Sequence, residues 1–214
     1  LREEDFVHIL EDSGARLLVT HPDLAAPIAA AGDRADAIFC HDHGSFANPP
    51  DSDTGFDPYR PAADDFAFML YSSGSTGKPK GIPHRHRDLI LPCDLVGSAI
   101  LGITADDVIF SASKFSFAYG LINSLAFPLF FGATAIIHPG KPDPASVLGI
   151  ISERRPTIFF TVPTIYSQLI LSCTANHLDV PMRVCYSAGE ALPSAIFEEW
   201  RRDRKSTRLN SSHT

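Results

Sequence analysis

The sequence predicts an α/β fold in which layered, mostly parallel sheets are flanked by helices. Short apolar runs alternate with amphipathic segments along most of its 214 residues, and this alternation is typical of parallel strands connected by helices. Several expected strands are continuously apolar, as strands covered on both faces are. With 44% apolar and 20% charged residues, a chain of this length can bury a substantial core.

The first part of the chain is expected to begin with a helix. Apolar residues recur at helical spacing at Phe6, Ile9 and Leu10, and Gly14 is placed to end that helix. A strand, a helix and a strand are then expected at residues 16–20, 24–31 and 36–40. Residues 41–65 are rich in Pro, Asp, Gly and Ser and predict a surface connection without a core of its own.

Strand and helix signals then alternate up to Arg202. Strands are expected at residues 66–70, 108–112, 133–138, 157–160 and 183–187. Helices are expected at residues 86–101, 118–131, 144–154, 163–172 and 193–202. We expect the first of these helices to be interrupted near Pro92, because proline has no N–H to donate, and the second to end at Gly132.

The last residues, 203–214, break this pattern. They contain a single aliphatic residue, Leu209, and no periodicity, which predicts a polar tail without regular structure. Their sequence also resembles the in-frame translation of a widely used short-read sequencing adapter. We therefore expect residues 203–214 to be non-native and the natural chain to continue beyond Arg202.

Composition disfavours several classes of protein. The net charge of −7 leaves no basic surplus with which to coat nucleic acid. No apolar run reaches the roughly 20 residues that span a bilayer. The four cysteines are widely spaced and form no CxxC pair, which predicts reduced thiols in a cytoplasmic protein. The Cys-His-Asp-His run at residues 40–43 matches no common zinc spacing, so no metal site is expected.

The strongest chemical signal is the run Tyr-Ser-Ser-Gly-Ser-Thr-Gly-Lys-Pro-Lys-Gly at residues 71–81. Its glycines let backbone N–H groups converge on an anion, its hydroxyls donate hydrogen bonds, and its two lysines supply positive charge. It is not a Walker A loop, because Ser72 and Pro79 stand where that motif has Gly and Ser or Thr. By composition alone, a surface loop without a ligand is the alternative.

The order of these residues resembles the phosphate-binding signature of the adenylate-forming superfamily, which includes acyl-CoA synthetases, aryl-CoA ligases, adenylation domains and luciferase-like enzymes. Residues 81–86 are similar to the segment that follows that signature, with Arg85 in place of the usual Thr. Residues 110–120 resemble the acyl-pocket segment of benzoate-CoA ligases, and residues 187–193 resemble their adenine-side loop. The resemblance covers residues 1–202.

This resemblance implies an ATP-dependent ligase with two half-reactions. A carboxylate and ATP form an acyl-adenylate and pyrophosphate, and the thiol of coenzyme A then displaces AMP. The expected substrates are a small carboxylic acid, ATP and coenzyme A, with Mg²⁺ as cofactor. As the composition indicates, neither a nucleic-acid partner nor a membrane span is expected. An apolar pocket with few polar groups suits a flat aromatic acid of the benzoate type.

The resemblance also assigns residues to three parts of a site. The ATP phosphates are expected at Ser72, Ser73, Gly74, Ser75, Thr76, Gly77 and Lys80, with Lys78 accessory. The acyl pocket is expected at Phe117, Ala118, Tyr119 and Gly120. The adenine and acyl ring are expected to meet Ser187, Ala188, Gly189 and Glu190. Glu190 has two open roles, as a hydrogen-bond acceptor or as a cap of the following helix.

Other parts implied by the resemblance have no counterpart in the sequence. These are the glutamate that helps to bind Mg²⁺, the aspartate that holds the ribose, and the small C-terminal domain with a catalytic lysine. The chain is therefore expected to be an interior piece of an incomplete N-terminal domain, inactive by itself. The alternatives are a medium- or long-chain fatty-acyl-CoA ligase, another adenylation enzyme, a non-catalytic nucleotide-binding module, and an unstable truncated product.

Overall fold

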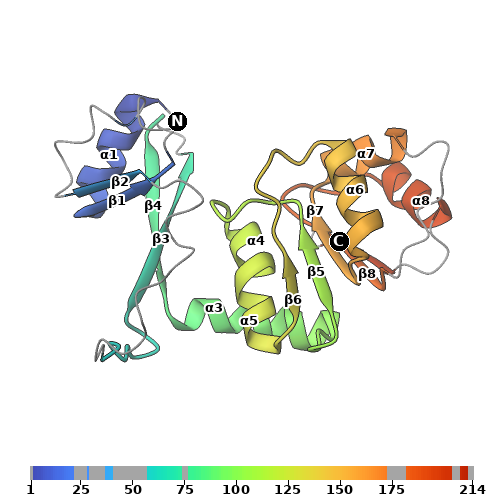
Figure 1. Cartoon of the computed structure of the whole chain (residues 1–214), viewed down its shortest axis with the longest axis horizontal. Coiled ribbons are helices and arrows are strands. Elements are labelled where there is room, and N and C mark those ends of the chain that lie inside the picture. The colour runs from blue at the N-terminus through green and yellow to red at the C-terminus, as the bar shows by residue number, and fades with distance from the viewer. Residues whose placement is uncertain are drawn as a thin grey trace. The chain divides into compact units, whose positions relative to one another are not determined.

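The computed structural model describes residues 2–21, 28, 37–40, 57–73, 77–172, 182–203 and 208–211 (Figure 1). For residues 37–40, 73, 203 and 208–211, only the backbone is described. The chain forms two compact units, Leu1–His86 and Arg87–Thr214. Within the described ranges, no helix has both the length and the apolar character needed to cross a membrane.

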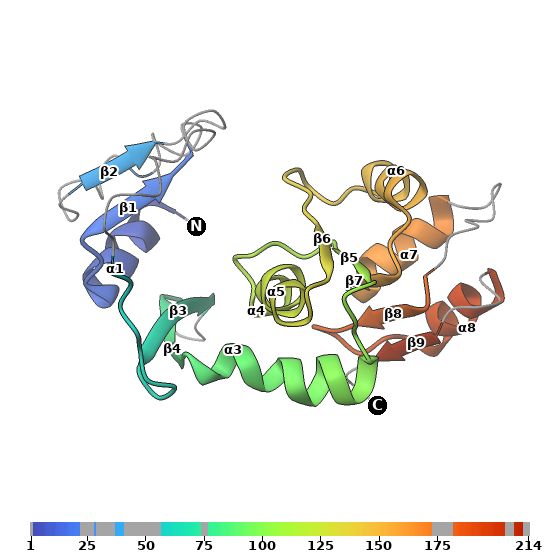
Figure 2. The same ribbon diagram turned by 60° about the horizontal axis from the view of Figure 1, so that its bottom comes forward.

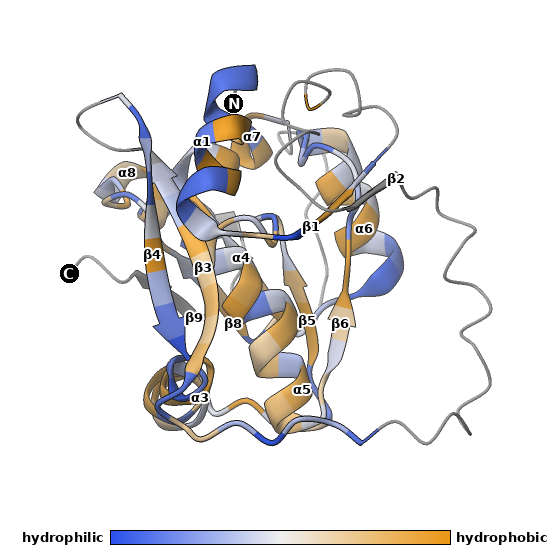
Figure 3. Cartoon of the chain, turned by 90° about the vertical axis from the view of Figure 1, so that its left-hand side faces the viewer, coloured by the Kyte–Doolittle hydropathy of each residue, from blue (hydrophilic) through white to orange (hydrophobic). Residues whose placement is uncertain are grey.

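The first unit begins with helix α1 (Glu3–Ser13). The Asp5 carboxylate accepts a hydrogen bond of 2.7 Å from the backbone N–H of Arg2, which pairs a donor at the helix start. Gly14 ends the helix in the left-handed conformation, with φ +63°, as the sequence predicts. The helix carries apolar residues on one side and charged residues on the other (Figure 3).

A small core and two sheets complete the first unit. Leu10 of α1 is buried together with Ile28. Strands β1 (Leu17–Thr20) and β2 (Ala37–Cys40) pair in parallel. The predicted helix at residues 24–31 lies outside the described residues except for Ile28, as does most of the predicted connection at residues 41–65.

Strands β3 (Phe66–Ser73) and β4 (Pro79–Arg85) form an antiparallel hairpin, and α1 packs against β4. Gly81 in β4 packs closely against its neighbours, because a Cβ there would overlap the sulfur of Met69 and displace that side chain. The sequence predicts the strand at residues 66–70 but not β4. Pro79, Lys80, Gly81 and Pro83 interrupt any apolar alternation, so the residue types do not indicate a strand. β4 forms because its backbone groups pair with those of β3.

The second unit is built around a five-stranded parallel sheet. Its strands are ordered β6-β5-β7-β8-β9, so each neighbouring pair is connected by a crossover rather than a hairpin. The strands are β5 (Val108–Ser111), β6 (Thr134–Ile136), β7 (Ile158–Thr161), β8 (Val184–Ser187) and β9 (Arg208–Ser211). The predicted mostly parallel sheet is thus confirmed, with β3–β4 as the antiparallel exception.

Side chains of the central strands alternate between two cores. In β7, Phe159 packs with α6 (Pro144–Arg154), α7 (Pro163–Ser172) and α8 (Ser194–Asp203) on one face, whereas Phe160 packs into the other core. Figure 2 shows these three helices on one side of the sheet and α4 and α5 on the other. Both faces are covered, which explains why the central strands are apolar throughout.

Helices with π-type turns cover the second face. Helix α3 (Arg87–Pro92) continues as π-helix η3 (Cys93–Leu101). The helix therefore changes from α-type to π-type directly after Pro92. Next, α4 (Ala118–Leu121), π-helix η4 (Ile122–Ala126) and α5 (Phe127–Phe131) replace the single helix predicted at residues 118–131. Pro128 has no N–H for the carbonyl of Ser124, and the α-type ladder is broken there.

Strand β9 corrects one expectation. The sequence predicts no regular structure in residues 203–214, but Arg208–Ser211 pairs with β8, with Leu209 opposite Cys185. The backbone N–H and C=O groups at the edge of β8 can pair with a strand that has no apolar pattern. Sequence periodicity does not predict a strand formed in this way. The non-native origin of residues 203–214 stays a prediction.

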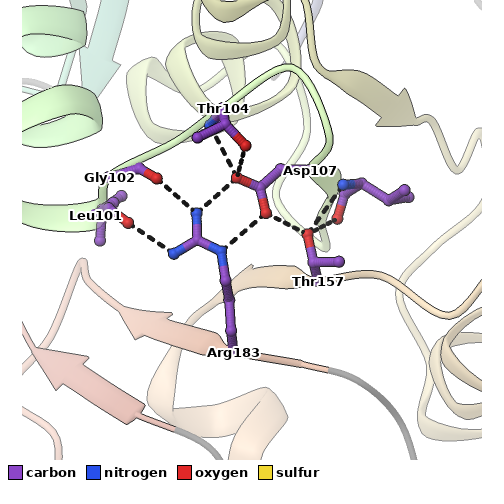
Figure 4. A network of polar contacts seen from close by, with 7 residues as sticks. Leu101, Gly102, Thr104, Asp107, Thr157 and Arg183 are labelled. Atoms are coloured by element: carbon purple, nitrogen blue, oxygen red, sulfur yellow. Dashed lines mark hydrogen bonds and ion pairs between the residues drawn. The ribbon is translucent and has the colours of Figure 1, made fainter.

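A polar network ties the amino ends of three neighbouring strands (Figure 4). Asp107 precedes β5, Thr157 precedes β7 and Arg183 precedes β8. The Arg183 guanidinium donates to both Asp107 carboxylate oxygens, at 2.9 and 2.6 Å, and the Thr157 hydroxyl donates to Oδ1 at 2.7 Å. Arg183 also donates to the carbonyls of Leu101 and Gly102 at the end of η3. The opposite, carboxyl ends of the strands are where ligands of such sheets bind.

Candidate functional site

The β3–β4 hairpin brings together two predicted phosphate-binding residues. Ser72 and Lys80 are cross-strand partners in the antiparallel register, so their side chains share one face of the hairpin. Both residues are exposed. A hydroxyl beside an ammonium group offers the donors that phosphate oxygens accept. These donors are compatible with an anion at the hairpin, and the assignment of the ATP phosphates to it stays a prediction.

The remaining phosphate-loop residues differ in what the structure shows. Gly77 has φ +88°, a conformation that residues with a side chain rarely adopt, although a Cβ there would meet no atom within 4 Å. Backbone conformation, not space, requires this glycine. Gly74, Ser75 and Thr76 lie outside the described residues, and only the backbone of Ser73 is described.

Helix α1 holds both strands of the hairpin through side-chain hydrogen bonds. His8 Nε2 donates to the carbonyl oxygen of Pro79 at 2.9 Å. The Tyr71 hydroxyl donates to Asp12 Oδ2 at 2.8 Å. Burial, with the hydrogen bond and charge of Asp12, raises the pKa of Tyr71 to about 12. Tyr71 therefore keeps its proton and remains a donor across the physiological pH range.

A groove of about 580 Å³ lies beside α1. It is lined by Arg2, Glu3, Glu4, Val7, His8, Glu11 and Lys78. Its three glutamates outnumber Arg2 and Lys78, so the groove has no surplus of positive charge to attract a triphosphate. Lys78 lines this acidic groove, whereas Lys80 is opposite Ser72, so Lys80 is the better placed of the two lysines for a phosphate.

The second unit contains a mostly apolar cavity of about 330 Å³. It lies between the π-type helices and the carboxyl end of β8. The lining residues are Pro92, Val96, Ala118, Tyr119, Ile122, Asn123, Phe127, Phe160, Tyr186 and Ala188. Three predicted residues, Ala118, Tyr119 and Ala188, come together here from two segments that are far apart in the sequence. The aromatic walls form a space suited to a flat apolar group.

Tyr119 connects this cavity to the sheet. Its hydroxyl lies 3.0 Å from the carbonyl oxygen of Tyr186 and 3.4 Å from that of Thr161, and it donates to this pair of acceptors. Burial raises the pKa of Tyr119 well above its ordinary value, and the neighbouring Tyr186 adds to the rise. The Tyr119 side chain is thus held in place by its hydroxyl, stays protonated, and lines the cavity without exchanging a proton near neutral pH.

Sequence reasoning missed Asn123. It lies in η4 and is 2% exposed, and its Nδ2 makes no hydrogen bond with the residues that the structure describes. It also missed Val96 and Ile122, which reach the cavity from the two π-helices. A π-turn moves side chains out of the α-helical register and is frequent at functional sites. Pro92 at the end of α3 and Pro128 in α5 flank the two π-helices and are a signal in the sequence for the change of winding.

Residues 187–190 run from the last residue of β8 into the loop after it, and their environments differ. Ser187 is buried but does not line the cavity, since alternation along β8 places it with Cys185 on the face of α6, α7 and α8. Gly189 has φ +91°, and a Cβ would be in ordinary contact with Val162 at 3.6 Å. Glycine is therefore required there by backbone conformation. Glu190 is exposed.

Phe117 and Gly120 are the other predicted acyl-pocket residues. Phe117 is 65% exposed and is not among the cavity-lining residues, so its predicted role near the carboxylate stays a prediction. Gly120 is buried, and a Cβ there would overlap the carbonyl oxygen of Lys114. Helix and backbone therefore approach closely at Gly120, whose predicted place in the acyl pocket stays a prediction.

Metal ligands are sparse in the parts of the chain that the structure describes. No group of three or more His, Cys, Asp or Glu side chains is placed there to hold an ion. His41, Asp42 and His43 lie outside these parts. The described residues thus offer no set of ligands for the Mg²⁺ that the resemblance implies.

A family model described as AMP-binding enzyme matches residues 1–210. The benzoate–CoA ligase of Thauera aromatica is 39% identical over 212 residues, covering 94% of this chain and 40% of the relative. The anthranilate–CoA ligase of Pseudomonas aeruginosa is 36% identical over 207 residues, covering 93% and 39%. The chain thus spans about two fifths of the length of these curated relatives.

Solved structures agree with the fold. A benzoate CoA ligase from Burkholderia xenovorans LB400 superposes with a TM-score of 0.83 at 34% identity, covering 99% of this chain and 44% of that one. The anthranilate CoA ligase AuaEII, solved in complex with anthranoyl-AMP, gives a TM-score of 0.84 at 30% identity, covering 99% and 42%. The predicted α/β fold is confirmed as that of the N-terminal domains of such enzymes.

Proposed function

Because the chain belongs to the AMP-binding enzyme family, we propose that its full-length protein is an ATP-dependent aryl-CoA ligase for an acid of the benzoate type. A carboxylate oxygen attacks the α-phosphorus of ATP, and the bond to pyrophosphate breaks as the acyl-adenylate forms. The thiol of coenzyme A then attacks the acyl carbon, loses its proton, and AMP leaves. The identity to benzoate- and anthranilate–CoA ligases supports this assignment.

The cavity of the second unit is the observation that carries the choice of an aromatic acid. Its volume of about 330 Å³ is near the lower end of the roughly 300–1,000 Å³ typical of small-molecule sites. Phe127, Phe160 and Tyr186 supply flat walls. Pro92 and Val96 add apolar surface from the preceding helix. A single ring fills such a space better than an extended alkyl chain.

The hairpin of the first unit is proposed to hold the phosphates of ATP that leave as pyrophosphate. The first half-reaction brings two anions together, so its barrier depends on charge neutralisation and alignment. Lys80 supplies the positive charge and Ser72 a hydroxyl on the same face. No step is assigned to Mg²⁺, for which the described residues form no ligand set.

An acid panel with the full-length protein tests this function. Benzoate, three hydroxybenzoates, hexanoate and palmitate are each incubated with ATP, Mg²⁺ and coenzyme A. Pyrophosphate release and thioester mass are then measured. We expect kcat/KM for at least one benzoate to exceed that for either aliphatic acid by about 100-fold, because the cavity discriminates at the transition state.

Three outcomes would contradict the proposal. Preference for palmitate would identify a fatty-acyl-CoA ligase. Pyrophosphate release without thioester in the presence of coenzyme A would identify a different adenylation enzyme. Nucleotide binding without turnover on any acid would leave a binding module. The 214-residue chain is assayed in parallel, and we expect no thioester from it, since it spans 40% of its benzoate–CoA ligase relative.

A further inference from the structure

We propose that helix α1 positions the phosphate-binding hairpin, with His8 and Asp12 as its positioning residues. The inference rests on the proposed function of Ser72 and Lys80. His8 and Asp12 are four residues apart on α1, so they share one face of the helix. One of them contacts β4 and the other contacts β3.

The contact of His8 fixes the backbone from which Lys80 extends. A carbonyl oxygen only accepts hydrogen bonds, so the 2.9 Å contact with Pro79 requires the proton on His8 Nε2. The Pro79 oxygen lies in the same rigid peptide plane as the nitrogen and Cα of Lys80. The proline ring also fixes φ of Pro79. Holding this oxygen therefore fixes where the Lys80 side chain starts.

The contact of Asp12 acts in the same way on Ser72. Asp12 Oδ2 accepts a hydrogen bond of 2.8 Å from Tyr71, the residue before Ser72 in β3. Neighbouring side chains of a strand point to opposite faces. The anchor thus occupies one face of the hairpin and leaves the face that carries the Ser72 hydroxyl to a ligand.

Gly81 is an independent sign that this anchor is built into the hairpin. It is the cross-strand partner of Tyr71. A Cβ at Gly81 would come within 3.0 Å of Tyr71 Cζ and 3.1 Å of Asp12 Oδ2. Because Gly81 has no side chain, the Tyr71 ring and the Asp12 carboxylate meet without having to shift by the few tenths of an ångström that a Cβ would require.

Substitutions in the full-length protein test the proposal by their effect on the two KM values. His8→Leu and Tyr71→Phe each remove one donor, and we expect each to raise KM for ATP about fivefold. KM for the carboxylic acid should change by less than about twofold, because the acyl cavity is untouched. His8→Gln can keep a donor in place and Asp12→Asn keeps an acceptor, so both should remain near wild type. Glu3→Gln is the control on α1, since Glu3 lines the groove and makes no hydrogen bond or ion pair with the described residues of the hairpin.

Hydrogen exchange of the peptide at residues 71–81 provides a readout that does not require activity. We expect faster exchange in His8→Leu and Tyr71→Phe than in wild type, and no change in Glu3→Gln. Unchanged exchange, an unchanged KM for ATP, or a loss confined to kcat would overturn the positioning role. An inactive wild-type protein would remove the proposed ligase function. The exchange rates would then still decide whether α1 anchors the hairpin.

Discussion

At Gly120, helix α4 lies too close to the preceding backbone for any side chain. A Cβ would overlap the carbonyl group of Lys114, and backbone atoms cannot move aside as a flexible side chain can. We expect Gly120→Ala to lower the free energy of unfolding by about 3 kcal/mol, measured by urea denaturation. The matched control is Gly149→Ala within α6, where a Cβ meets nothing within 4 Å. That substitution should stabilise by about 0.5–1 kcal/mol, and equal effects at both sites would contradict the packing argument.

Ala118 offers a test of the cavity at the same scale. It is exposed and lines the cavity, so a larger side chain there narrows the space without disturbing the core. We expect Ala118→Leu in the full-length protein to reduce kcat/KM for ring-substituted benzoates about tenfold more than for benzoate. Ala145→Leu, on the exposed surface of α6, is the control. Equal losses on all acids would indicate misfolding and not a narrowed pocket.

Single residues also show how far sequence reasoning reaches into the site. Ala118, Tyr119 and Ala188 were predictable because their motifs are ordered and specific. Asn123 and Tyr186 were not. Asn123 reaches the cavity through a π-turn, and Tyr186 does so through the alternation of a strand whose two faces are both apolar. The positions of Asn123 and Tyr186 at the cavity depend on local backbone geometry, which the order of residue types in the sequence does not indicate.

Among the elements, the amino ends of β5, β7 and β8 are held by the carboxylate of Asp107. Its side chain is 5% exposed. Burial by itself raises the pKa of Asp107, but hydrogen bonds from Arg183, Thr157 and the Thr104 backbone, with the charge of Arg183, outweigh it and lower the pKa below its usual value. The ionised form is therefore the one that the folded state favours.

The pH dependence of stability follows from the direction of that shift. Because the pKa of Asp107 is lower in the folded than in the unfolded state, its stabilisation is fully present above the unfolded value of about 4 and is lost as pH falls through the folded value. We expect Asp107→Asn to cost about 2 kcal/mol at pH 7 and less below pH 4. Urea denaturation at several pH values measures this. Glu153→Gln removes a carboxylate from an exposed pair and should change stability by less than about 0.5 kcal/mol at any pH.

The elements that sequence reasoning predicted correctly are those with strong apolar patterns. The strands β5, β7 and β8 and the helices α6, α7 and α8 lie within a few residues of their predicted ranges. The two strands that the sequence pattern does not predict, β4 and β9, form by backbone pairing with a neighbouring strand. Their sequences have no period-two apolar pattern, so residue types do not indicate these strands, and each pairs where a neighbouring strand offers its backbone groups.

At the scale of the whole chain, the two units differ in the size of their described cores. The first has Leu10 and Ile28 at its centre. The second has two clusters, one on each face of its sheet, that include Ile151, Phe160 and fully buried Trp200. Opening the second unit must expose both of its clusters to water. Opening helix α1 of the first unit exposes only the small cluster around Leu10, which costs less free energy.

We therefore expect native-state hydrogen exchange to separate the two units. Backbone amides of β7 and β8 should be protected at least about 100-fold more than those of α1. Ile151→Ala should reduce the protection of β5, β7 and β8 together, by about 2–4 kcal/mol, because the cluster joins α6 to the whole sheet. Ile137→Ala, at a position 53% exposed, is the control and should leave protection unchanged. If Ile151→Ala affected only α6, the sheet and its helices would not be opening as one cooperative unit.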